Sequence, residues 1–215
     1  MKFYESGDNR KPVIFLFPGT CCLYSSFDHV LDGLHSYFYT VAVSYDGFDP
    51  NEKTEFYSME DECEKIEQEI KKKYAGRIKA AYGCSLGGSF VSLLIQRKRI
   101  HIDHGIIGSS DMDEADRLVA KIKSSMVVPF MYKMIHTGAL PKFMQKKLNK
   151  TDEVKKELYN GFLNMFGIGK GGSPWITKQS IYNQFYSDLV TKIQHGIDVP
   201  GPTIYVFYAT LMGKQ

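Results

Sequence analysis

The chain has 215 residues, of which 43% are hydrophobic and 24% are charged, and its formal net charge is +3. This length suits one sizeable hydrophobic core rather than two full domains, and the composition is ordinary for a globular protein. The small net charge gives no argument for nucleic-acid binding, and no apolar run approaches the length of a membrane span.

Four cysteines and the N-terminal residues bear on the cellular compartment. Cys21, Cys22, Cys63 and Cys84 include no pair with metal-ligand spacing. Adjacent cysteines cannot form an unstrained disulfide. The N-terminal residues lack the apolar core of a signal peptide. We therefore expect a reduced, cytoplasmic protein that holds no metal and needs no cofactor.

The first predicted elements are two strands and a helix. Residues 13–17 form a continuous apolar run, and residues 40–45 form a second run rich in β-branched residues. Uninterrupted hydrophobicity favours strands that are covered on both faces, as in a parallel sheet. Between residues 59 and 74, apolar residues recur every three or four positions, which predicts a helix that buries one face.

A serine between glycines comes after the next apolar run. Residues 78–83 predict a strand, Gly83-Cys84-Ser85-Leu86-Gly87 predicts a sharp turn, and residues 90–95 predict a buried helix. A G-x-S-x-G turn between a strand and a helix is the context of a nucleophile elbow, which raises the serine hydroxyl above the sheet. Side chains two residues either side of the serine would collide in so tight a turn. The N–H groups at the start of the helix would face a developing oxyanion.

The second half of the chain changes character. Residues 103–108 predict a weaker strand, whereas about 113–195 show helical periodicity without a strand pattern. Residues 203–209 form an aromatic and β-branched run that predicts a last strand. Strands that alternate with helices predict an α/β fold, a doubly wound and mostly parallel sheet, with a helical cap inserted before the last strand.

This pattern divides the chain into a core, residues 1–111 and 199–215, and a helical cap, residues 112–198. The cap is rich in methionine and aromatic residues, which could line an adaptable lipophilic pocket or simply pack the cap helices. These residues are Met126, Phe130, Met131, Tyr132, Met134, Phe143, Met144, Phe162, Met165 and Phe166.

The sequence resembles the α/β-hydrolase family over most of its length. The resemblance rests on the elbow at 83–88 and on Phe17-Pro18-Gly19-Thr20, which stands where the family often has a His-Gly oxyanion loop. Asp46-Gly47 is similar to the family's turn after the fourth strand. A helical cap between the sixth and seventh strands is also common in the family.

The resemblance implies roles for individual residues. Ser85 would be the nucleophile, and the backbone N–H groups of Leu86 and Thr20 would form the oxyanion hole. The family's acid comes after the sixth or seventh strand, which makes Asp111 the candidate acid. Asp111 could equally be the N-cap of the next helix.

The catalytic base is where the sequence departs from the family pattern. A serine needs a base to act as a nucleophile at neutral pH, and the family places its histidine after an eighth strand. No histidine comes after residues 203–209, so the other histidines are candidates only by elimination, and a structural role suits each of them. They are His29, His35, His101, His104, His136 and His195.

The sequence therefore predicts a serine hydrolase that cleaves an ester or related acyl bond of a small molecule, which the cap could select for lipophilicity. A thioesterase or an acyltransferase would use the same elbow. The alternative is a catalytically silent or truncated α/β-hydrolase-like binding protein. The strand 203–209, as the edge of the sheet, also predicts self-association through its unpaired side.

Overall fold

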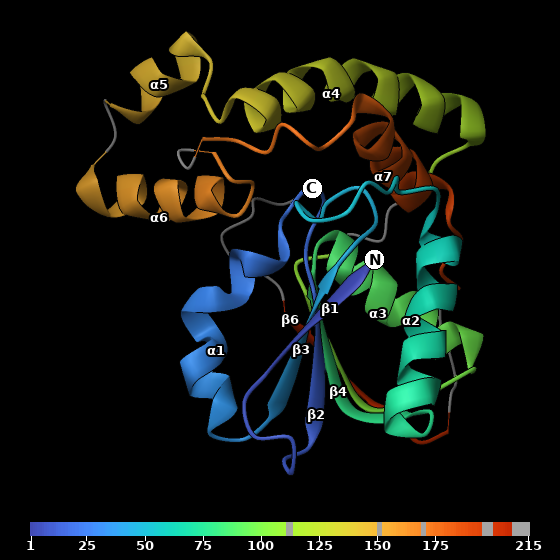
Figure 1. Cartoon of the computed structure of the whole chain (residues 1–215). Helices are drawn as coiled ribbons and strands as arrows, with labels where there is room; N and C mark the ends of the chain where they lie inside the picture. The colour runs from blue at the N-terminus through green and yellow to red at the C-terminus, as the bar shows by residue number, and fades with distance from the viewer. Residues whose placement is uncertain (111–113, 150–151, 169–170, 195–199, 208–215) are drawn as a thin grey trace.

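A computed structural model describes the chain except for residues 111–113, 150–151, 169–170, 195–199 and 208–215. Six strands form one sheet in the order β1-β3-β2-β4-β5-β6, with helices on both faces (Figure 1). All neighbouring strands are parallel except β1, which runs antiparallel to β3. The strands are β1 (Lys2–Ser6), β2 (Val13–Phe17), β3 (Tyr39–Ser44), β4 (Arg77–Cys84), β5 (His101–Gly108) and β6 (Thr203–Phe207). The predicted α/β class and mostly parallel sheet are confirmed.

The helices form two groups. One group covers the sheet, with α1 on one face and α2 and α3 on the other (Figure 1). The second group, α4 to α7, lies between β5 and β6 in the sequence and gathers beyond one end of the sheet; we call these the insertion helices. The bounds are η1 (Tyr24–Phe27), α1 (Asp28–His35), α2 (Met59–Tyr74), α3 (Leu86–Arg97), α4 (Arg117–Thr137), α5 (Lys142–Leu148), α6 (Glu153–Asn164) and α7 (Lys178–Val190).

The continuous apolar run of β2 is explained by its place inside the sheet. Phe15 and Phe17 belong to the large core on the side of α2 and α3, whereas Ile14 and Leu16 belong to a smaller cluster on the side of α1. Both faces of β2 are therefore buried, so alternation between apolar and polar residues is absent. Helix α2 behaves as its periodicity predicts, because only one of its faces carries the buried apolar side chains.

The two edge strands differ. Strand β1 was not predicted, because its five residues mix polar and apolar side chains and are only half buried. Strand β6 was predicted, and its apolar residues from Ile204 to Phe207 are 42% to 60% exposed. In the described part of the chain, no strand pairs with the outer side of β6. None of the described helices combines the length and the apolar character needed to cross a lipid bilayer.

Candidate active site

Ser85 occupies a one-residue turn between β4, which ends at Cys84, and α3, which begins at Leu86. Its backbone has φ +54° and ψ −126°, a conformation that residues other than glycine rarely adopt. The Ser85 N–H donates a hydrogen bond to the Gly108 carbonyl at 2.9 Å, which ties the turn to the end of β5. Ser85 is exposed while Leu86 is fully buried, so the turn presents the serine hydroxyl and places the next side chain in the core.

The glycines around Ser85 are required by close backbone approaches. A Cβ atom on Gly83 would lie 2.0 Å from the Gly87 carbonyl oxygen, and one on Gly87 would lie 2.1 Å from the Phe17 carbonyl oxygen. A Cβ on Gly19 would lie 3.7 Å from the Ser85 Cβ. The elbow geometry expected from the glycine spacing is therefore present, and the loop after β2 lies directly against it.

The two expected oxyanion donors belong to these adjoining segments. Leu86 is the first residue of α3, where backbone N–H groups have no partner within the helix. Thr20 comes after Gly19 in a turn that is closed by a hydrogen bond from the Cys22 N–H to the Gly19 carbonyl at 3.0 Å. The structure thus brings the loop of Thr20 and the turn of Ser85 and Leu86 together at the carboxyl edge of the sheet.

Gln184 on α7 anchors this loop, and no sequence motif indicated it. Its side chain is fully buried, and its Oε1 accepts a hydrogen bond of 2.6 Å from the N–H of Cys21, the residue after Thr20. Cys21 has φ +60°, so the bond stabilises a strained backbone. Gln184 is therefore a positioning residue for the loop that carries Thr20.

The rest of α7 is attached to the loop after β3. The Ser180 hydroxyl accepts from the Phe56 N–H, and the Ser187 hydroxyl accepts from the Met59 N–H at 2.7 Å. Ser180, Gln184 and Ser187 recur every three or four residues, so they share one face of the helix. A buried polar face on α7 therefore joins the loops after β2 and β3.

The cysteines near Ser85 are not nucleophiles. Burial raises the pKa of the Cys84 thiol, and burial together with the nearby Cys84 raises the pKa of Cys22 to about 12. A thiol reacts as its thiolate, so both cysteines stay unreactive at neutral pH.

Two of the histidines have structural partners. His35 lies 2.9 Å from the Ser6 hydroxyl, and His101 Nε2 lies 3.1 Å from an Asp103 carboxylate oxygen at the amino end of β5. Ser85 is at the opposite, carboxyl end of the neighbouring strand. Neither histidine can serve as a base for Ser85 in this arrangement.

His29, His104 and His136 are the other histidines that the structure describes. His29 is exposed on α1, His104 lies near Tyr205 with ring centres 6.0 Å apart, and His136 lies in α4. Among the described residues, no histidine is hydrogen-bonded to Ser85. His195 lies outside the described residues.

The predicted acid, Asp111, also lies outside the described residues. The first described helix after β5 is α4, which begins at Arg117 with Asp116 at its N-cap position. The N-cap interpretation of Asp111 therefore finds no support from α4.

A cavity of about 390 Å³ adjoins the elbow on the α1 side of the sheet. Its wall includes Gly19 and Cys84, the neighbours of Thr20 and Ser85, and Met165 from the insertion. The remaining lining residues are mostly apolar: Ile14, Leu16, Ser26, Phe27, His29, Val30, Leu34, Tyr82 and Ile106. The volume lies within the range of small-molecule sites.

The methionine and aromatic residues of the predicted cap have mixed surroundings. Met134 and Phe166 are buried, whereas Met126 and Phe130 are exposed. Met165 reaches the cavity. Most of the others that the structure describes pack against the core. The side chains of Phe143 and Phe162 lie outside the described part of the molecule.

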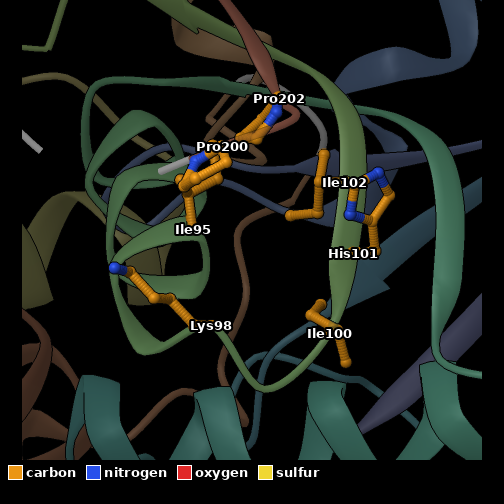
Figure 2. A pocket seen from close by; sticks show the side chains of 7 residues that line it. All are labelled: Ile95, Lys98, Ile100, His101, Ile102, Pro200 and Pro202. Atoms are coloured by element: carbon orange, nitrogen blue, oxygen red, sulfur yellow. The ribbon is translucent and has the colours of Figure 1, made fainter. Parts of the chain in front are cut away.

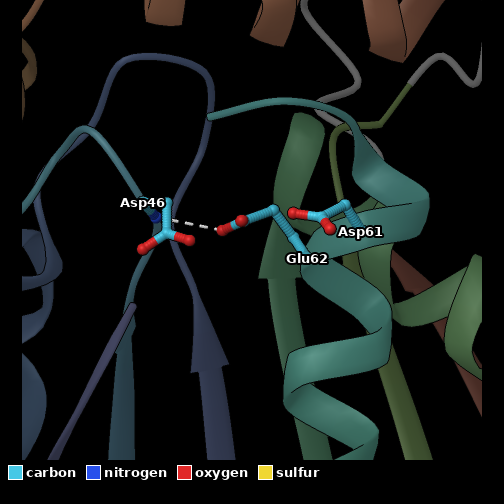
Figure 3. A group of neighbouring side chains, drawn as sticks. All are labelled: Asp46, Asp61 and Glu62. Atoms are coloured by element: carbon cyan, nitrogen blue, oxygen red, sulfur yellow. Dashed lines mark hydrogen bonds between the residues drawn. The ribbon is translucent and has the colours of Figure 1, made fainter. Parts of the chain in front are cut away.

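Three carboxylates lie together after β3, at the start of α2 (Figure 3). The Lys65 ammonium group contacts Asp46 at 2.6 Å, Asp61 at 2.5 Å and Glu62 at 3.1 Å, so it already supplies a cation to all three. Burial, with the nearby Asp46 carboxylate, raises the pKa of Glu62 to about 7. This cluster anchors α2 to the turn at Asp46-Gly47 and gives no support for a metal site.

A smaller cavity of about 250 Å³ lies at the far end of the sheet (Figure 2). Ile100, His101 and Ile102 line it where β5 begins, together with Lys98 and the prolines that precede β6. Because Ser85 lies beyond the carboxyl end of β4, this cavity is separate from the candidate active site.

Comparison with known proteins gives the fold. Solved structures match at TM-scores of 0.65 and 0.67: an α/β-hydrolase family protein from Desulfitobacterium hafniense and a carboxylesterase from Nitrososphaera gargenis, each 14% identical. The chain has the α/β-hydrolase fold. The matches cover 88% and 95% of this chain, and 72% and 74% of those chains. The enol-lactonase from Burkholderia xenovorans LB400 matches at TM-score 0.62 with 12% identity, over 89% of this chain and 71% of that one.

No protein-family model matches the sequence, and no curated protein is detectably similar to it in sequence. The α/β-hydrolase fold was therefore recognisable from the short elbow motif and the order of elements rather than from overall sequence similarity.

Proposed function

We propose that the protein is a serine hydrolase that cleaves an ester or related acyl bond of a small, lipophilic molecule. Ser85 is the nucleophile, and the backbone N–H groups of Thr20 and Leu86 form the oxyanion hole. The single observation that carries the proposal is the strained, exposed Ser85, held in a turn that only glycines at 83 and 87 permit. Backbone strain of this kind persists where the surrounding structure enforces it.

This geometry suits nucleophilic attack on a carbonyl group. The Ser85 oxygen attacks the carbonyl carbon, and the carbonyl electron pair moves to the oxygen, which accepts hydrogen bonds from the two N–H groups. Collapse of this intermediate breaks the bond between the acyl carbon and the leaving oxygen or sulfur. The leaving group takes up the proton lost by the Ser85 hydroxyl and departs as the alcohol or thiol, and an acyl-serine remains. Water then attacks the acyl-serine, the bond between the acyl carbon and the Ser85 oxygen breaks, one proton of the water returns to that oxygen, and the acid is released. Asp111 is the proposed acid, and residues 112–198 form the proposed cap.

The cavity beside Gly19 and Cys84 supports a lipophilic acyl group. It is mostly apolar and begins next to the nucleophile, so the acyl part of the substrate would extend toward α1. The enol-lactonase and the carboxylesterase among the structural neighbours are hydrolases of acyl–oxygen bonds, which agrees with this proposal.

Labelling with a serine-directed fluorophosphonate tests the assignment. We expect labelling of the parent chain and of Ser125→Ala, which removes an exposed serine in α4, and no labelling of Ser85→Ala. Labelling that persists in Ser85→Ala would show that another residue is the nucleophile.

One observation favours a second candidate, a catalytically silent binding protein of the same fold. None of the described histidines is bonded to Ser85, and a serine without a base reacts poorly. A correctly folded parent chain that resists the probe, but still binds apolar esters, would support this candidate over the hydrolase.

A further inference from the structure

Helix α4 carries an apolar stripe on its solvent-facing side. Leu118, Ile122, Met126 and Phe130 recur every four residues, so they line up along one face. They are 70%, 53%, 74% and 41% exposed, and Val119 beside them is also exposed. Isolated exposed apolar residues are ordinary, but a continuous stripe over three turns marks an interaction surface.

The opposite face of α4 already has its packing partners. Ala120, Ser124, Val128 and Ile135 are buried, and α4 packs against α7 on that side. Figure 1 shows α4 along the outer border of the insertion helices, on the side away from the sheet. The apolar stripe is therefore not needed to hold the described insertion helices together, and it faces away from the part of the molecule that the structure describes.

Basic residues accompany the stripe. Helix α4 contains Arg117, Lys121, Lys123 and Lys133, and no acidic residue. On a helical projection, Lys121 and Lys123 lie on the two borders of the stripe and Lys133 lies within it. Residues 114–194 as a whole contain 13 basic and 6 acidic residues, although the complete chain contains 27 and 24. The positive charge of the protein is thus concentrated in the region that presents the stripe.

We propose that α4 docks on an anionic lipid surface. Helices that lie in a membrane interface carry apolar side chains along one face and lysines at its borders. The apolar stripe enters the acyl boundary, and the ammonium groups bind the phosphate headgroups. Helix α4 would lie on the membrane without crossing it.

A second copy of the chain suits the surface less well. Two α4 helices related by a twofold axis would bring the same basic residues against each other, because such an interface uses the same patch on both subunits. Like charges that face each other across an interface oppose association. An anionic bilayer offers its acyl boundary to the apolar stripe and its negative headgroups to the basic residues at the borders. This inference does not depend on catalysis by Ser85.

Vesicle sedimentation tests the proposal with the full chain. The probes are vesicles of phosphatidylcholine alone and of phosphatidylcholine mixed with phosphatidylserine. We expect the protein to sediment with the mixed vesicles and to dissociate as salt is raised, because the attraction is screened. Lys121→Gln with Lys123→Gln should reduce the partition coefficient about 25-fold, at about fivefold for each charge near the surface.

The apolar contribution is tested by Ile122→Asp with Met126→Asp, which should abolish sedimentation. Tyr37→Asp is the control, because Tyr37 is 73% exposed but lies between α1 and β3; it should bind like the parent. Thermal melting verifies that each variant is folded. A parent that ignores mixed vesicles, or α4 variants that bind as well as Tyr37→Asp, would overturn the proposal. Light scattering that shows a parent dimer, dissociated by the Ile122 and Met126 changes, would assign the stripe to a second copy instead.

Discussion

Replacing Gly87 with alanine tests the elbow geometry most directly. The new Cβ would lie 2.1 Å from the Phe17 carbonyl oxygen, whereas ordinary contacts begin at 3.4 Å, so β2 and α3 must separate by about 1.3 Å. Overpacking of a buried site costs about 1–3 kcal/mol, partly offset by up to about 1 kcal/mol of improved helix propensity. With about 2–4 °C for each kcal/mol in a chain of this size, we expect the melting temperature to fall by several degrees.

The matched control is Gly33→Ala. Gly33 is also a helical glycine, in α1, but an added Cβ would meet no atom within 4 Å. The free energy of unfolding of this variant should therefore rise by about 0.5–1 kcal/mol, because alanine favours the helix more than glycine does. The displacement in Gly87→Ala would separate the N–H groups of Thr20 and Leu86, and a shift of about 1 Å costs about 100-fold in rate. Thermal melting and the rate of fluorophosphonate labelling measure both effects. If Gly87→Ala melts and labels like Gly33→Ala, the proposed role of this contact is wrong.

Three further predictions concern other parts of the fold. Gln184→Ala should lower the free energy of unfolding by about 1–3 kcal/mol, because it leaves the buried Cys21 N–H without an acceptor, and it should slow fluorophosphonate labelling. Gln179→Ala replaces an exposed residue on the same helix and should change neither the stability nor the labelling rate. The raised pKa of Glu62 means that the folded state keeps a proton that the unfolded state releases. The contribution of Glu62 to stability is therefore complete below about pH 4.5 and is lost as the pH rises to about 7. Glu62→Gln should remove this decline in melts recorded across that range, and an unchanged decline would contradict the assignment. Val206→Lys on the exposed edge strand should reduce self-association in light scattering, whereas a parent that is monomeric at every concentration would refute association through β6.

The elements that could be predicted are those with a local cause. The run at residues 13–17 lies inside the sheet and is apolar on both faces, so its sequence alone indicates a parallel strand. The elbow is equally local, because glycine is required at 83 and 87 by backbone contacts within the turn itself and with the neighbouring strand β2. Such patterns survive when overall sequence similarity is lost.

The features that could not be predicted depend on distant segments. Strand β1 is defined by its pairing with β3 rather than by its own five residues. Gln184 lies 163 residues from its partner Cys21, and nothing near a glutamine identifies such a contact. The recurrence of Ser180, Gln184 and Ser187 on one face of α7 was the available signal, since polar residues at helical spacing can mark a buried polar face as well as a solvated one.

The strand order has a consequence for how the chain is made. Five adjacent strands, β1 to β5, are all encoded within residues 2–108, whereas β6 begins at residue 203. At about 5–20 residues per second, a ribosome takes roughly 5–20 seconds to reach β6 after finishing β5. During that interval the outer side of β5, with Ile106 and Ile107, has no strand to pair with. Nascent chains are therefore most prone to aggregation while the insertion helices are being synthesised, and lower growth temperatures or a chaperone that shields β5 should raise the yield of folded protein.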